Sequence, residues 1–253
     1  MLSKTIITRI RRLELKKFRR AEGMFLAEGP RLLTELLGSF RCRLLVATDA
    51  WLSRQPFSPQ ADEIVRVTDD ELRRASLLTS PQEVLALMEL PPEDPDFLAP
   101  KRELCLALDG VQDPGNVGTI VRLADWFGIS HVFCSIDTAD VFAPKALQAT
   151  MGGVARVKVS YVDLGALIDG LDGGAPVYGT FIDGESIYAH RLSGHGLIVM
   201  GNEGRGISRT VEEKVSCRLT IPSFPPERRA VESLNVAMAT AVVCSEFRRS
   251  ELT

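Results

Sequence analysis

An asparagine and an arginine stand at the start of one helical segment in the C-terminal half of the chain. The apolar run Leu104–Leu108 leads into Asp113-Pro-Gly, which is turn chemistry, and Asn116 is expected to cap the helix that follows. On a helical wheel Arg122 points away from the apolar face. A lone exposed arginine on a helix is usually only solvated, but its position within two turns of a glycine-rich helix start that follows a strand favours a functional role.

Glycines surround a carboxylate in a second segment, Val199–Ser208 (VMGNEGRGIS). Gly201, Gly204 and Gly206 allow the backbone to approach a ligand closely. Glu203 among them disfavours phosphate and suits a cationic ligand. An ordinary corner between a strand and a helix is the alternative interpretation.

A third segment brings polar side chains to the start of an apolar helix. Ser233 is expected to cap this helix, which is apolar all round from Leu234 onward. Asn235 is the exception, and its amide needs a partner. That partner is either the backbone of the adjacent loop or a group in an active site.

The elements that position these segments alternate between short apolar runs and helices. Runs that are apolar on both faces predict a parallel sheet covered by helices on both sides, hence an α/β fold. In such sheets ligands bind at the carboxyl ends of the strands, where all three segments begin. The runs are Leu104–Leu108, His131–Cys134, Val157–Val162, Val177–Phe181, Leu197–Met200 and Cys217–Ile221.

The 253 residues divide at a proline-rich stretch. Glu89–Pro100 holds four of the fourteen prolines and predicts a linker, preceded by a small α/β module. We expect a basic N-terminal arm or helix at 1–20, a domain at 21–90, a linker at 91–101 and a second domain at 102–253.

The net charge of −3 conceals a basic N-terminus. Residues 1–20 carry eight lysines and arginines and one glutamate, which suits contact with nucleic-acid phosphates. A solvated helix that binds nothing is the alternative. Only replacement of several of Arg9, Arg11, Arg12, Lys16 and Lys17 would separate the two.

Several function classes lack their motifs. The G-x-G-x-x-G fingerprint for dinucleotides is broken after Leu108, and neither a P-loop nor a G-x-S-x-G elbow occurs. His190 and His195 lie in a loop without matching ligands, and the five scattered cysteines predict no metal site and no disulfide framework. No run is long enough to span a membrane, so we expect a cytoplasmic protein with no membrane contact.

Together the segments Asp109–Asp125, Val199–Ser208 and Ile221-Pro222 with Glu232–Thr240 resemble the SpoU/TrmH branch of the SPOUT superfamily, the RNA ribose 2′-O-methyltransferases. Thr150–Val154 resembles the stretch between the first two of these motifs. Phe25–Leu33 and Ser80–Ala86 resemble the branch's RNA substrate-binding domain, which is similar to an RNA-binding ribosomal protein. The loop Ser223–Val231, with Arg228 and Arg229, is longer and more basic than the family pattern.

The resemblance implies a C-terminal trefoil knot, a homodimer formed through the knotted domain, and S-adenosylmethionine (AdoMet) as methyl donor without a metal. It implies that Arg122, with Asn116 beside it, acts on the ribose 2′-hydroxyl, and that Glu203, Ser233 and Asn235 shape the pocket. The cofactor contacts that it implies are Thr180, Gly201, Asn202, Gly204, Ile221, Pro222 and Leu234.

Since an arginine is a poor base, we expect Arg122 to bind the adjacent phosphate and the developing 2′-oxygen while the proton leaves through phosphate or water. The substrate-binding domain favours ribosomal RNA, and 23S rRNA in particular. Transfer RNA, or an RNA-binding assembly protein that keeps the fold without turnover, is the alternative.

Overall fold

A computed structural model describes residues 2–56, 58–225 and 233–249. The chain forms two compact units. The first contains residues 1–92 and 140–155, and the second contains residues 93–139 and those from 156 onward. Arg228, Arg229 and Glu232, which the sequence analysis singled out, lie outside the described residues.

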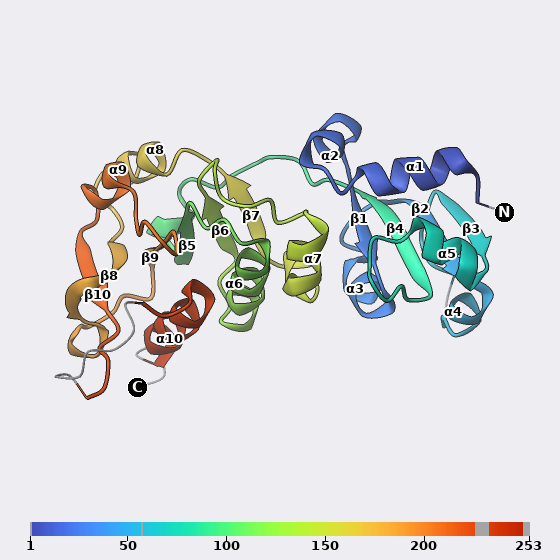
Figure 1. The fold of residues 1–253 in the computed structure, drawn as a ribbon. Coiled ribbons are helices and arrows are strands. Elements are labelled where there is room, and N and C mark those ends of the chain that lie inside the picture. Colours follow the sequence, from blue (N-terminus) through green and yellow to red (C-terminus); the bar gives the residue numbers. More distant parts are fainter. Residues whose placement is uncertain (1, 57, 226–232, 250–253) are drawn as a thin grey trace. The chain divides into compact units, whose positions relative to one another are not determined.

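The first unit is built on a four-stranded mixed sheet of order β1-β4-β2-β3 (Figure 1). β2 and β3 run parallel, whereas β4 is antiparallel to both of its neighbours. The strands are β1 (Met24–Glu28), β2 (Cys42–Thr48), β3 (Glu63–Val67) and β4 (Val84–Glu89). The helices are α1 (Lys4–Arg12), α2 (Lys16–Glu22), α3 (Pro30–Leu36), α4 (Asp49–Ser53), α5 (Asp69–Ala75) and α7 (Pro144–Thr150).

The basic N-terminal residues form helices that are packed onto this sheet. Ser3 caps α1, and Ile10 and Leu13 are completely buried in the core with strand residues of β1, β2 and β4. Because a continuous apolar stripe lies under the basic side chains, residues 1–20 belong to the folded unit.

Residues 140–155, which follow the second strand of the C-terminal sheet in sequence, pack in the first unit. The ring of Phe142 lies 4.7 Å from that of Phe25, and the side chain of Gln148 donates a 2.7 Å hydrogen bond to the carbonyl of Glu28. From the sequence, this segment was expected in the domain at 102–253. Its contacts are with β1 and α3.

The second unit is a six-stranded sheet, parallel throughout, of order β10-β8-β9-β5-β6-β7. All six strands that the sequence predicts are present, and the α/β fold class is confirmed. The strands are β5 (Leu104–Asp109), β6 (His131–Cys134), β7 (Lys158–Tyr161), β8 (Val177–Ser186), β9 (Gly196–Gly201) and β10 (Cys217–Thr220). β8 is longer than predicted, because a register shift at Arg218/Leu219 lets its end pair with β10.

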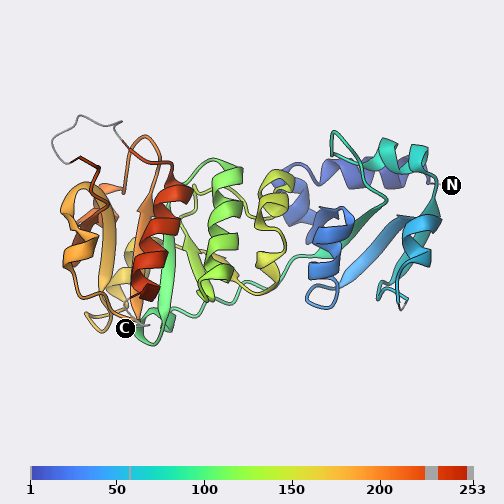
Figure 2. The ribbon, with the colours of Figure 1, turned by 90° about the horizontal axis from the view of Figure 1, so that it is seen from below.

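Helices cover both faces of this sheet. α8 (Leu164–Asp169) and α9 (Arg209–Glu212) pack on a core that contains Cys105 and Ala107, while α6 (Pro114–Trp126) and α10 (Val236–Arg249) lie side by side on the other face (Figures 1 and 2). The trefoil knot stays a prediction, since the path into α10 includes residues outside the described ranges. Among the described residues, no helix is long and apolar enough to cross a membrane.

Candidate active site

The ends of β5 and β9 form a fixed edge at the middle of the parallel sheet. The two strands pair up to Asp109 and Gly201. Asp109 is buried, and its carboxylate accepts a 2.6 Å hydrogen bond from the backbone N–H of Ser208. The end of β5 is therefore tied to the far side of the glycine-rich loop that follows β9.

Asn202 anchors the glycine-rich loop from within. Its amide nitrogen donates to the carbonyl of Gly110 at 2.6 Å, and its amide oxygen accepts from the backbone N–H groups of Gly204 and Arg205 at 2.9 and 3.0 Å. The backbone of Asn202 is paired as well, since its N–H donates to the carbonyl of Gly206 and its carbonyl accepts from the Gly206 N–H, both at 2.9 Å. Asn202 is therefore a structural anchor of the loop.

The glycines of this loop have different structural roles. A Cβ on Gly201 would overlap the backbone of Gly206 and Ile207, so packing of the loop excludes any side chain there. At Gly204 the nearest atom to such a Cβ is the Asn202 Oδ1, 3.7 Å away. Space therefore remains open at Gly204, where a ligand could approach the backbone.

Three of the predicted site residues are in direct contact, although they lie far apart in sequence. The side-chain nitrogen of Asn116 donates to Glu203 Oε1 at 2.8 Å. The side-chain nitrogen of Asn235 donates to Asn116 Oδ1 at 3.1 Å. The three motifs consequently meet in one polar chain, Glu203–Asn116–Asn235, at the carboxyl edge of the sheet.

Two capping residues differ from the prediction. Asp113, and not Asn116, caps α6, because its carboxylate accepts from the Asn116 N–H at 2.9 Å. Asn235, and not Ser233, caps α10, since its amide oxygen accepts from the N–H groups of Ala237 and Met238. In both places the residue directly before the helix has the geometry to bond the first free N–H groups. The Asn116 side chain can therefore take part in the polar chain.

Arg122 lies on the exposed side of α6, as its helical position predicts. It makes no hydrogen bond or ion pair within the described ranges, 2–56, 58–225 and 233–249. Trp126, four residues further along the same side of the helix, is 83% exposed. An exposed guanidinium less than two turns from Asn116 is accessible to an external anion.

The remaining predicted cofactor contacts lie at the neighbouring strand ends. Thr180 is near the bulged end of β8, and its hydroxyl donates to the carbonyl of Val199 at 3.1 Å. Ile221 and Pro222 follow β10, which pairs with β8. Leu234 is half exposed, and hydrogen bonds among the described residues do not join Ser233 to the polar chain.

A small network behind the site was not anticipated from the sequence. Gly110 has a φ of +70°, and its N–H donates to the Ser135 hydroxyl at 2.8 Å, which in turn donates to Asp137 at 2.6 Å. The sequence features that form it are Gly110, which follows the first strand of this sheet, and Ser135, which follows the next. Only the adjacency of β5 and β6 shows that the two loops bind each other.

One group of metal-ligand residue types lies at the opposite, amino end of the sheet. His131 Nδ1 is 2.5 Å from Glu103 Oε1, and Cys105 lies beside them. Burial raises the pKa of the Cys105 thiol to about 12, so it keeps its proton at neutral pH. His190 and His195, the pair singled out in the sequence, bind different partners: Glu185 at 2.9 Å and Ser193 at 2.8 Å.

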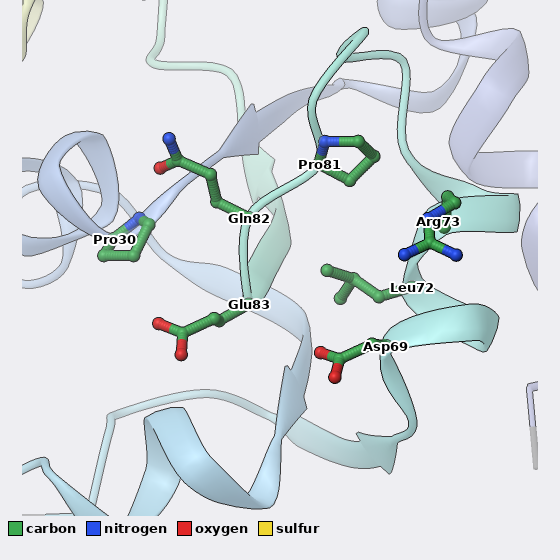
Figure 3. Close-up of a pocket in the computed structure, with 7 residues that line it drawn as sticks. All are labelled: Pro30, Asp69, Leu72, Arg73, Pro81, Gln82 and Glu83. Carbon is green, nitrogen blue, oxygen red and sulfur yellow. The ribbon is translucent and has the colours of Figure 1, made fainter.

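A pocket in the first unit joins the two segments that resemble a substrate-binding domain. Pro30 comes from the first segment, and Pro81, Gln82 and Glu83 come from the second (Figure 3). The segments are held together by the backbone bond from the Gly29 N–H to the Val84 carbonyl, 2.9 Å. Two carboxylates and one arginine line the pocket, a balance that does not favour phosphate.

Residues 103–245 match the model of the SpoU rRNA methylase family, which covers more than half of the chain. The chain belongs to the SpoU rRNA methylase family. Residues 4–86 match the MRM3-like substrate-binding domain. The family membership that the three motifs indicated is thereby confirmed, and so is the presence of an N-terminal domain of the substrate-binding type.

Similar proteins cover nearly the whole chain. The 23S rRNA (guanosine(2553)-2′-O)-methyltransferase RlmP of Bacillus subtilis is 31% identical over 248 residues, 94% of each chain. A solved structure from Porphyromonas gingivalis, assigned to the TrmH family of RNA methyltransferases, is 45% identical with a TM-score of 0.89 and covers 98% of this chain and 99% of its own. An AdoMet-bound rRNA methyltransferase from Sinorhizobium meliloti is 26% identical with a TM-score of 0.82, covering 100% and 97%.

The residues at the carboxyl edge fit AdoMet. Gly204 leaves room for close approach to the backbone, Ile182 and Leu234 offer exposed apolar surface, and Glu203 supplies a negative charge for a sulfonium.

Proposed function

We propose that the protein transfers a methyl group from AdoMet to the 2′-hydroxyl of a ribose in 23S ribosomal RNA. The observation that carries this proposal is the polar chain Glu203–Asn116–Asn235 with the exposed Arg122, which has no partner among the described residues, on the same helix as Asn116. RlmP of Bacillus subtilis is named as a methyltransferase of a guanosine 2′-hydroxyl in 23S rRNA, and its similarity extends over both units of this chain. That full-length match favours ribosomal RNA over transfer RNA.

In this proposal the residues of the chain divide the work by their chemistry. Arg122 binds the phosphate beside the target ribose and stabilises the negative charge that develops on the 2′-oxygen. Asn116, held by Glu203 and Asn235, orients the hydroxyl, and Ser233, which precedes Asn235 in the third motif, helps to shape the pocket. The proton leaves through the phosphate or water, because a guanidinium does not accept it.

The cofactor is proposed to be held mainly by backbone groups. Thr180, Gly201, Asn202 and Gly204 line one side at the ends of β8 and β9, and Ile221, Pro222 and Leu234 the other. AdoMet supplies the electrophilic methyl group when it is bound. The packing requirement at Gly201 and the open space at Gly204 support this assignment.

We propose residues 21–90 as the RNA substrate-binding domain, 1–20 as a basic RNA-contacting segment, 91–101 as linker and 102–253 as the methyltransferase domain. Exposed cations support the role of the basic segment. Arg12 stacks on the ring of Phe18 at 3.9 Å and Lys17 lies 5.0 Å from it. Cations held over a ring keep their charge available to phosphates.

We also propose that the protein forms a homodimer through α6 and α10. It is proposed to act in the cytoplasm, where bacteria make ribosomal RNA. These helices lie side by side and expose Trp126 and Met238, and Leu234, just before α10, is exposed as well. Apolar side chains of this size on adjacent helices are typical of an interface. Sedimentation of wild type against Trp126→Glu tests it: a dimer that Trp126→Glu dissociates is expected, and a monomeric wild type would contradict it.

The reaction is tested with purified protein, AdoMet carrying a labelled methyl group, and transcripts of 23S rRNA fragments or transfer RNA. A ribosomal fragment that takes up label and then resists alkaline cleavage at one nucleotide carries a 2′-O-methyl group there. Comparing that nucleotide in RNA from cells with and without the gene then identifies the natural target. AdoMet binding without transfer to any RNA would instead support the alternative of an assembly protein.

A further inference from the structure

Arg205 is the second arginine at the carboxyl edge of the sheet, and the reaction described above gives it no role. It stands at the tip of the glycine-rich loop, two residues from Glu203. Its side chain is 71% exposed. Its backbone is nevertheless fixed, because its N–H donates to Asn202 Oδ1 at 3.0 Å and Asn202 is itself bonded to the carbonyl of Gly110.

The partner of Arg205 holds it only weakly. One guanidinium nitrogen lies 4.0 Å from Asp137 Oδ2, on the loop after β6. Asp137 is 60% exposed, and its other oxygen accepts from the Ser135 hydroxyl at 2.6 Å. An exposed pair at that distance contributes little to stability, so the guanidinium can exchange this partner for another anion.

Carboxylates outnumber cations in the segments that form this edge, so each cation matters for binding an anionic substrate. The segments 109–122, 135–139, 201–208 and 233–235 carry four carboxylates, Asp109, Asp113, Asp137 and Glu203. The same segments carry two basic residues, Arg122 and Arg205. An RNA strand that approaches this edge would be repelled unless both cations meet its phosphates.

We propose that Arg205 binds an RNA phosphate beside the target ribose and that Asp137 holds the guanidinium in position when RNA is absent. This inference rests on the proposed function, since it assigns a substrate contact to the same site. Arg205 lies beside Glu203 on an anchored loop, while Arg122 lies beside Asn116 on α6. The two arginines then contact the RNA backbone from the two sides of the polar chain.

The test is the variant Arg205→Gln in the full chain, assayed with the 23S rRNA fragment that wild type methylates. We expect the KM for RNA to rise about fivefold to tenfold, with kcat within about twofold and AdoMet affinity unchanged. The slope of log KM against log salt should fall by about one, as for the loss of one phosphate contact. Arg205→Lys, which keeps the charge, should restore most of the affinity.

Arg209→Gln is the matched control. Arg209 is a 90% exposed arginine four residues further along, at the start of α9, and it pairs with Glu213 at 2.8 Å. Its removal should change neither the KM nor the salt slope. Equal effects of Arg205→Gln and Arg209→Gln, or an unchanged KM in both, would overturn the inference, as would a loss of AdoMet affinity as large as the loss of RNA affinity.

Asp137→Asn tests the second half of the proposal, since asparagine keeps an acceptor for Ser135. It should lower the KM for RNA about twofold to threefold in wild type and have less effect together with Arg205→Gln. An equal effect in both backgrounds would show that Asp137 acts on RNA without Arg205. If wild type methylates no RNA, the proposed function fails by itself. Direct binding of the 23S rRNA fragment for which wild type has the highest affinity then still compares Arg205→Gln with Arg209→Gln.

Discussion

The basic helices of the first unit and the carboxyl edge of the six-stranded sheet use arginine in opposite ways. In the helices Arg9 pairs with Glu22 at 2.7 Å, and Arg19 is buried against Asp140 at 2.5 Å. At the edge, Arg122 has no partner within the described part of the chain. A high density of charge therefore does not by itself mark the site; a charge that the fold leaves unbalanced does so more directly.

The largest expected effect follows from Arg122. Its replacement by alanine should lower methyl transfer by about 10² to 10³-fold, because one donor to the developing oxyanion is lost. AdoMet binding, measured by calorimetry, should stay as in wild type. Arg209→Ala, which removes an exposed arginine outside the site, is the control. Near-normal turnover of Arg122→Ala would show that the unbalanced charge has no catalytic role.

The opposite use of arginine is tested by Arg19→Met. Arg19 is 3% exposed, and besides Asp140 it donates to the carbonyls of Leu13 and Glu14 at 2.8 and 2.7 Å. Its loss leaves the largely buried Asp140 carboxylate with only the Phe142 N–H as donor and takes away the donor to both carbonyls, at a cost of about 3–5 kcal/mol of unfolding free energy. Denaturation followed by fluorescence reports on the first unit through the buried Trp51.

Arg9→Met supplies the matched comparison for Arg19→Met. The Arg9 side chain is 48% exposed and its pair with Glu22 is solvated, so the expected loss is about 0–1 kcal/mol. Equal losses for the two variants would mean that Asp140 is satisfied without Arg19, and the distinction between structural and available arginines in these helices would fail.

The cations that the fold leaves available in the same helices should show a smaller, salt-dependent effect. The double change Arg12→Gln and Lys17→Gln removes the two charges held over Phe18. Affinity for the 23S rRNA fragment should fall about tenfold at moderate salt, and the salt slope should fall by about two. In filter-binding titrations, an unchanged slope would identify α1 and α2 as a solvated face that does not touch RNA.

The sequence was informative where one physical rule acts alone. Runs that are apolar on both faces can only be strands of a covered parallel sheet, and all six are present. The meeting of Asn116 and Glu203 follows from the same rule, since both residues come after strands whose carboxyl ends share one edge. The third motif was expected beside them through the resemblance to the SpoU/TrmH branch.

It was less informative where two residues compete for one role. Asn116 and Ser233 are as good N-caps by type as Asp113 and Asn235, and only backbone geometry decides between them. The packing of residues 140–155 in the first unit depends on Phe142 meeting Phe25, a contact without any local signal. The extension of β8 depends on a register shift with β10, which is likewise a property of two distant segments.

The smallest effect concerns a carboxylate that the first unit buries, in contrast to the exposed Glu203 of the edge. Glu28 is 4% exposed and accepts from the Ser76 hydroxyl and the Leu77 N–H. Burial raises the pKa of Glu28 above its ordinary value of 4.5, although these hydrogen bonds and Arg11 oppose the shift. The folded state therefore keeps its proton at pH values where the unfolded chain has lost it.

The sign of the pH dependence follows from this difference. As the pH rises from the ordinary glutamate pKa through the raised one, the folded state binds more protons than the unfolded state, so the free energy of unfolding falls. Glu28→Gln removes this contribution. The stability of wild type minus that of Glu28→Gln, measured by denaturation between about pH 4 and about pH 8, should fall by about 1 kcal/mol per unit of pKa shift and level off above the raised pKa. A difference that rises with pH would mean that the hydrogen bonds of Ser76 and Leu77 outweigh burial, and that the first unit holds Glu28 as a paired anion.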